Sequence, residues 1–195
     1  MRELMRRFPL LVSRPHRVFW IYSLSPLGFL GAALLIPAVA LLVFLVGGCG
    51  EELGWRGFAL PRLQRKHSAL TSSFLLSIAW AGWHLPAFFY VPSYVALGLW
   101  ILPGFFLGIL AGTIVLTWLY NSSHGSVLAV VLWHASFNFV SASPNAGGFV
   151  AAVTSTLVMV WAVVIVSRYR AATLAAEPKH VTPTGVLAAD DAQFV

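Results

Sequence analysis

The sequence predicts an all-α protein: a polytopic transmembrane bundle of about six apolar helices, with its active site inside the bundle near the cytoplasmic face. Of the 195 residues, 59% are hydrophobic and 9% are charged, and the mean hydropathy is +0.84. A soluble domain carries charge on about a quarter of its residues. No Asp, Glu, Lys or Arg occurs from His67 to Ser167. Apolar segments near the length of about 20 residues that crosses a bilayer recur in that stretch.

The predicted elements follow the apolar segments and their breaks. Residues 1–17 form a basic cytoplasmic or interfacial lead-in, and residues 168–195 form a polar, loosely ordered cytoplasmic tail. Residues 18–167 form the transmembrane domain between them, in which Pro37 is expected to separate the first two helices. The predicted helices span residues 18–36, 38–60, 69–91, 96–120, 126–142 and 148–167.

The basic residues lie in clusters that flank the apolar segments, near residues 14–17, 62–66 and 168–170. Because basic loops stay on the cytoplasmic side, we expect a multi-pass protein of the cytoplasmic membrane with both termini in the cytoplasm. The net charge of +6 then indicates topology and contact with anionic membrane lipids. No nucleic-acid partner is expected, since the basic groups do not line one soluble face.

Three charged side chains interrupt one apolar segment. Glu51, Glu52 and Arg56 are the only charged residues between Arg17 and Arg62. An ionisable group inside a membrane is a candidate functional residue because its burial is costly. Glu52 and Arg56 share a helix face and are expected to pair, whereas Glu51 is turned by about 100° and is available as a general base. The alternative is an ion pair that locks two helices, with a spare carboxylate near the surface.

Two further polar groups lie in later apolar helices. His84 shares a helix face with Trp80 and directly precedes Leu85-Pro86, which is expected to kink the helix. His134 and Asn138 also lie four residues apart on one face. Taken alone, His84 is better explained as a hydrogen-bonded packing residue. The later pair is equally well explained by interhelical hydrogen bonds.

These polar groups would satisfy one another in a single cavity and would form a hydrolytic site there. Glu51 and His84 would activate water, while His134 and Asn138 would meet the developing negative charge. A small transporter with a proton or cation path is the alternative from another class. It predicts an internal repeat, which the sequence lacks.

Three segments resemble, in order, the motifs of the CPBP family, the CAAX prenyl proteases and bacteriocin-processing proteases also called Abi. Gly50 to Gln64 resembles the Glu-Glu-x-x-x-Arg motif. Trp80 to His84 resembles the second motif, an aromatic residue four before a histidine, and His134 to Asn138 resembles His-x-x-x-Asn. The resemblance covers roughly residues 17–142.

The resemblance implies an intramembrane, glutamate-dependent endopeptidase, a hydrolase that acts on membrane peptides or lipidated C-termini such as prenylated CAAX sequences. It makes Glu51 the base, with His84 helping to hold the water. Glu52 and Arg56 would support the site, and the His134–Asn138 pair would stabilise the oxyanion.

The resemblance leaves open whether the enzyme is a metalloprotease. A Zn²⁺ site would use Glu52, His84 and His134 and would leave a position open for water. Arg56 beside Glu52 competes with a cation, which slightly favours metal-free chemistry.

The segment before the Glu-Glu motif is shorter than is common in the family. We therefore keep two further expectations. In one, a homo-oligomer supplies a wall of the site from a second copy. In the other, the chain is a catalytically inactive relative that acts as a membrane immunity or partner-binding protein.

Overall fold

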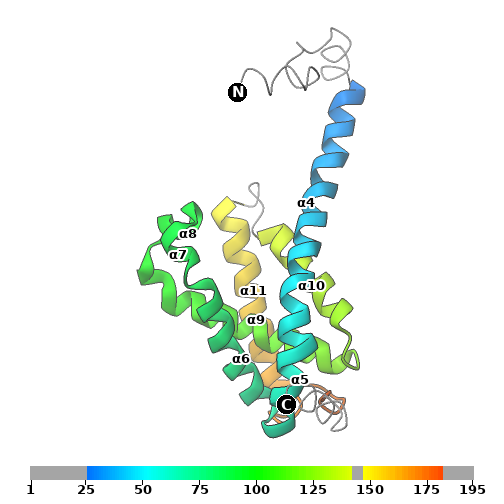
Figure 1. Ribbon diagram of the computed structural model, residues 1–195, viewed down its shortest axis with the longest axis vertical. Helices are drawn as coiled ribbons and strands as arrows, with labels where there is room; N and C mark the ends of the chain where they lie inside the picture. The colour runs from blue at the N-terminus through cyan, green and yellow to red at the C-terminus, as the bar shows by residue number, and fades with distance from the viewer. Residues whose placement is uncertain (1–25, 142–146, 182–195) are drawn as a thin grey trace, which may run out of the picture. The chain divides into compact units, whose positions relative to one another are not determined.

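The computed structural model describes residues 26–141 and 147–181, and within these ranges it contains helices and turns but no strand (Figure 1). The chain divides into two compact units, with the boundary between Leu42 and Val43. The lead-in at residues 1–17 lies outside the described residues. The elements are α4 (Pro26–Gly54), the π-helix η1 (Trp55–Ala59), α5 (Leu60–Lys66), α6 (Ala69–His84), α7 (Ala87–Tyr90), α8 (Pro92–Leu97), the 3₁₀-helix η2 (Leu99–Ile101), α9 (Leu102–Ser122), α10 (Val127–Ser141) and α11 (Gly147–Arg168).

Helix α4 corrects the prediction of two helices that turn near Pro37. The structure has one helix of 29 residues from Pro26 to Gly54, and Pro37 lies in its interior. Pro26 starts the helix, where a missing N–H is tolerated. Pro37 lacks the N–H for one backbone hydrogen bond, yet the residues on both sides of it remain helical. The predicted number of six apolar helices is therefore not confirmed.

Helix α6 begins after a capping serine and ends just before a Leu-Pro pair, both of which are evident in the sequence. The Ser68 hydroxyl accepts a hydrogen bond from the Thr71 N–H at 3.1 Å and caps the first turn. The helix ends at His84, and Leu85-Pro86 leads into the short helices α7 and α8. The predicted kink after His84 is thus a complete break, and the predicted span 69–91 is divided between α6 and α7.

The core of the second unit, Val43–Val195, is built around α9. This helix packs against both α6 and α11, and its Val115 and Leu116 are fully buried. Two apolar clusters result, one shared mainly with α11 and one shared with α5 and α6. A buried hydrogen bond of 2.9 Å from Ser73 to Thr117 also joins α6 to α9.

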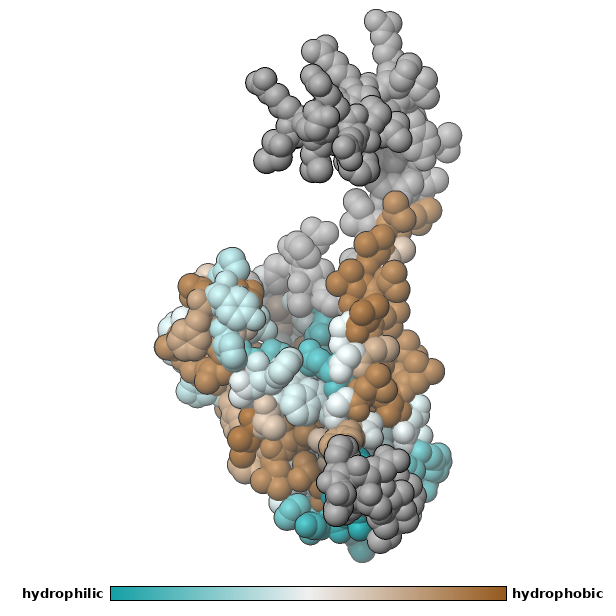
Figure 2. Space-filling view, in the orientation of Figure 1, coloured by the Kyte–Doolittle hydropathy of each residue, from teal (hydrophilic) through white to brown (hydrophobic). Residues whose placement is uncertain are grey.

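Two helices in the described part of the chain are long and apolar enough to cross a membrane. They span Leu99–Ser122 and Gly148–Arg168, and only 28% and 17% of their most apolar windows are buried inside the protein. A core helix of a soluble protein would bury most of such a window. Figure 2 shows extensive apolar surface, which together with these two helices is typical of a membrane protein.

The later predicted spans agree with the structure at their C-terminal ends. The predicted helices 126–142 and 148–167 correspond to α10 and α11. The predicted span 96–120 begins later than expected, because Gly98 takes a positive φ of 73° and separates α8 from η2 and α9.

The segment after α11 is more ordered than the predicted loose tail. Leu174 is fully buried, and the backbone N–H groups of Ala69 and Leu70 donate to the carbonyls of Ala172 and Ala171. Two buried amides, Gln64 and Asn121, hydrogen-bond each other and also hold this segment. Their further bonds, of 2.8 to 3.1 Å, are to the Thr173 carbonyl and to the backbone of His180. Residues 169–181 therefore belong to the folded unit.

Candidate active site

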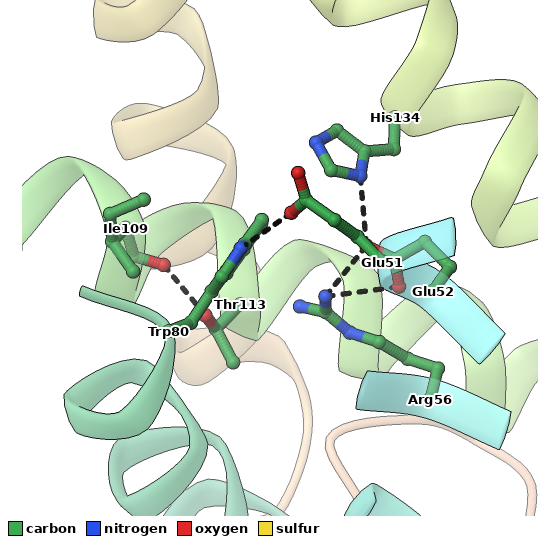
Figure 3. Close-up of polar contacts among 7 residues, drawn as sticks. All are labelled: Glu51, Glu52, Arg56, Trp80, Ile109, Thr113 and His134. Carbon is green, nitrogen blue, oxygen red and sulfur yellow. Dashed lines mark hydrogen bonds and ion pairs between the residues drawn. The ribbon is translucent and has the colours of Figure 1, made fainter. Parts of the chain in front are cut away.

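An ion pair between neighbouring helical turns forms the buried base of the site. Arg56 Nη1 donates to both carboxylate oxygens of Glu52, at 2.8 and 3.0 Å, and both residues have no exposed surface. The i,i+4 spacing predicted this pair. His134 Nδ1 on α10 lies 2.8 Å from Glu52 Oε1, so the carboxylate joins two helices that are far apart in sequence (Figure 3). The pair therefore orients His134 as well as compensating its own charges.

Arg56 lies in a π-helical turn that sequence reasoning missed. The N–H of Leu60 donates to the carbonyl of Trp55, which is the wider i→i+5 bond of a π-helix. Single π turns inside α-helices occur often at functional sites. The Nε and Nη2 atoms of Arg56 have no hydrogen-bond partner among the described residues, although both are buried. Nη1 alone makes its contacts with Glu52.

The second glutamate has a separate partner. The indole N–H of Trp80 on α6 donates to Glu51 Oε2 at 2.8 Å (Figure 3). Glu51 is half-buried and lines a cavity, whereas Glu52 lies behind it and is fully buried. The two adjacent carboxylates thus occupy different environments, as the difference of about 100° between their helix directions predicts.

Trp80 is the residue that the sequence prediction left out of the site. Its ring lies 5.4 Å from the His134 ring at 85° and 6.0 Å from the His84 ring. The Arg56 guanidinium lies over the indole at 4.7 Å, a cation–π contact. The signal was present, because an aromatic residue four before His84 must share its helix face. Trp80 contacts residues from three of the predicted motifs.

A backbone contact fixes the orientation of His84. Its Nδ1 lies 2.9 Å from the carbonyl oxygen of Trp80, which can only accept. Nδ1 therefore donates, and the neutral imidazole has its lone pair on Nε2. The ring also packs edge-on against Phe105 of α9 at 5.8 Å. His84 is thus held with Nε2 available to accept a hydrogen bond from a bound water.

Four of the six predicted site residues line one cavity of about 650 Å³. Glu51 comes from α4, His84 from α6, and His134 and Asn138 from α10. Glu52 and Arg56 are not in the lining and stand behind it. Apolar side chains of α9 and α11 form much of the remaining wall, with the hydroxyls of Ser155 and Thr156 among them. The volume lies in the range of about 300–1,000 Å³ that is usual for ligand-binding cavities.

The residues named as a possible zinc set are not arranged around a common point. Within the described ranges, no three His, Cys, Asp or Glu side chains lie where they could share a metal ion. Glu52 uses its oxygens for Arg56 and His134, and His134 directs Nδ1 at that carboxylate rather than at a cation. Zn²⁺ binding by Glu52, His84 and His134 would require Glu52 to exchange its present partners, and it stays a prediction.

In comparisons with known proteins, residues 32–140 match the family model described as type II CAAX prenyl endopeptidase Rce1-like. The chain is also similar to CAAX prenyl protease 2 of Methanococcus maripaludis. The two are 34% identical over 115 residues, which is 57% of this chain and 42% of that relative. The chain thus spans less than half the length of the relative. No solved structure matches the chain.

Proposed function

This chain belongs to the Rce1-like family of type II CAAX prenyl endopeptidases, and on that premise we propose that it is an intramembrane endopeptidase. Its proposed substrates are membrane-embedded peptides or lipidated protein C-termini, of which prenylated CAAX sequences are one class. One observation supports this proposal most directly. Three helices contribute polar side chains to one cavity of about 650 Å³, namely Glu51, His84, His134 and Asn138.

The proposed reaction begins with a water molecule between Glu51 and His84. Glu51 removes a proton from the water while the lone pair on His84 Nε2 orients it. The resulting hydroxide attacks the carbonyl carbon of the scissile peptide bond. The Trp80 N–H bonded to Glu51 Oε2 leaves the other carboxylate oxygen available for that proton. In this scheme Glu51 Oε2 is bonded to the Trp80 indole and the other oxygen takes the proton. His84 Nδ1 is bonded to the Trp80 carbonyl, and Nε2 orients the water.

The attack places negative charge on the peptide carbonyl oxygen. His134 and Asn138 are one helical turn apart and are proposed to donate to this oxyanion. Nδ1 of His134 contacts the buried Glu52 carboxylate, which leaves Nε2 as the ring nitrogen proposed to face the oxyanion. When the C–N bond breaks, protonated Glu51 returns its proton to the leaving amine, and a carboxylic acid and an amine are released.

We propose this chemistry without a metal ion, because the carboxylate, imidazole and amide groups supply a base, an orienting acceptor and oxyanion donors. Zn²⁺ dependence is the competing form of the mechanism. For either form we propose that the reaction takes place near the cytoplasmic face of the cytoplasmic membrane. A homo-oligomer that completes the cavity is compatible with either form.

The test compares purified wild type with Glu51→Gln in detergent. Both proteins are incubated with prenylated CAAX peptides and with unmodified membrane peptides, with and without a chelator, and products are identified by mass spectrometry. Cleavage by the wild type that is lost in Glu51→Gln supports the proposal, and loss on chelation of the wild type would replace it with the zinc mechanism. Two folded proteins that cleave none of the substrates would favour an inactive relative that binds a membrane partner.

A further inference from the structure

A second cavity shares no lining residue with the cavity of the candidate site. It is a groove of about 670 Å³ between η1 and α5 on one side and the middle of α6 on the other. None of the six predicted site residues lines it. Its basic side chains are Arg62, Arg65 and Lys66 of α5, and its apolar wall includes Trp55, Phe58 and Leu75. The groove therefore presents a cationic part and an apolar part side by side.

The apolar wall remains exposed in the folded unit. Phe58 is 57% exposed and Leu75 is 37% exposed, although both belong to helices whose opposite faces are buried. No Asp or Glu lines the groove. An inorganic anion would gain nothing from the apolar wall, and a plain acyl chain would gain nothing from the cations. A ligand that uses both must be anionic at one end and apolar along the rest.

The surroundings of the groove add to its positive charge. The segment after α11 lies beside the start of α6, and Lys179 Nζ donates to the His67 carbonyl at 2.8 Å. Figure 2 shows hydrophilic residues gathered at this end, below the apolar surface. Among the acidic residues of the described ranges, Glu51 and Glu52 belong to the site, and Glu177 lies in the segment after α11. The basic side chains at this end thus outnumber the acidic ones.

We propose that this groove binds one anionic phospholipid from the surrounding bilayer. Its phosphate lies at Arg65 and Lys66, and an acyl chain lies along Phe58 and Leu75. The helical wall around the groove is part of a membrane protein, so lipid is the amphipathic anion available at high local concentration. The site is separate from the proposed protease chemistry and does not depend on it.

The test measures lipid binding to the full chain in detergent by native mass spectrometry. Phosphatidylglycerol, phosphatidylcholine of the same acyl chains and glycerol phosphate without chains are the three probes. The Arg65→Gln/Lys66→Gln variant removes the charges in the groove. Arg168→Gln/Arg170→Gln removes the same charge near that end of the unit from residues that do not line the groove.

We expect the wild type to prefer phosphatidylglycerol over phosphatidylcholine. Removal of Arg65 and Lys66 should reduce that preference at least about tenfold, since each basic side chain near a lipid surface contributes about fivefold. The Arg168/Arg170 variant should keep the preference. Leu75→Asp should weaken binding of both phospholipids. Equal losses in the two charge variants, or equally tight binding of glycerol phosphate, would overturn the proposal in favour of a diffuse charge effect or a free phosphate site.

Discussion

Trp80 and Glu51 are joined by a 2.8 Å hydrogen bond in which the indole N–H is the donor. The bond connects α6 to the C-terminal part of α4, and it fixes one oxygen of the proposed base. Because the same indole contacts Arg56 and both site histidines, it positions the base relative to the rest of the site. Trp80 is therefore a positioning residue.

Trp80→Phe keeps an aromatic ring but removes the donor to Glu51. We expect kcat to fall about 10- to 100-fold with little change in KM, because a hydrogen bond to a charged group contributes about 1.5–3 kcal/mol. Steady-state kinetics on a cleaved peptide reporter provide the measurement. Trp161→Phe is the matched control, since Trp161 packs against Trp118 away from the cavity. Equal kinetics in Trp80→Phe and wild type would contradict the positioning role.

Glu52→Gln leaves the Arg56 guanidinium buried without its counter-charge. We expect a loss of about 3–5 kcal/mol in the free energy of unfolding, together with loss of activity. Glu52→Gln/Arg56→Met should recover much of the stability but none of the activity, because His134 would still lack its carboxylate. Thermal unfolding in detergent, monitored by tryptophan fluorescence, tests whether the wild type and the double variant are both more stable than Glu52→Gln. A single variant as stable as wild type would show that the pair is not buried in solution.

Gly48 allows α4 to approach α10 closely. A Cβ at this position would lie 3.5 Å from the Val131 carbonyl and 3.7 Å from the Ala135 Cβ. Gly48→Ala should therefore be tolerated, whereas Gly48→Leu should push α4 away and separate Glu52 from His134. Gly47→Leu is the control, since nothing lies within 4 Å of its Cβ position. We expect activity only in Gly48→Ala and Gly47→Leu. Full activity in Gly48→Leu would contradict the packing.

Asn121→Ala removes an amide that makes four hydrogen bonds, two with Gln64 and two with the segment after α11. We expect faster amide hydrogen exchange across residues 171–181, and a loss of about 1–3 kcal/mol because Gln64 is left buried with fewer partners. Peptide cleavage should persist, since the amide lies outside the catalytic cavity. Ser123→Ala, which loses only a 3.3 Å bond, should exchange like wild type. Unchanged exchange in Asn121→Ala would refute the attachment.

Local spacing was enough to predict part of this structure. The Glu52–Arg56 pair, the different environments of the two glutamates and the interruption of a straight helix at Leu85-Pro86 all follow from helix geometry or from proline chemistry, although a kink was predicted there and the helix ends. The helices at 127–141 and 147–168 follow from apolar length. Each depends on residues within about one or two turns of each other, where the helix itself determines the geometry.

Contacts between distant segments could not be predicted in this way. Glu52 meets His134 across 82 positions, and Gln64 meets His180 across 116. Periodicity gives the face on which a side chain lies but not the helix that it faces. The continuous α4 was missed for a different reason, because the basic residues on both sides of residues 18–60 were expected on one side of the membrane, which requires a turn.

The π-helical turn has a consequence for how the chain tolerates insertions and deletions. Its wider i→i+5 bond accommodates one residue more than an α-helix would, so deletion of Gly57 would restore an uninterrupted α-helical phase. Glu51 and Glu52 precede the turn and would keep their directions. Residues of α5 would also keep their directions, with Gln64 in its buried pair and Arg65 and Lys66 at the groove, because the wider turn had absorbed the extra residue. A one-residue deletion elsewhere between the glutamates and Gln64 lacks this compensation and would rotate Gln64 by about 100° relative to Glu52.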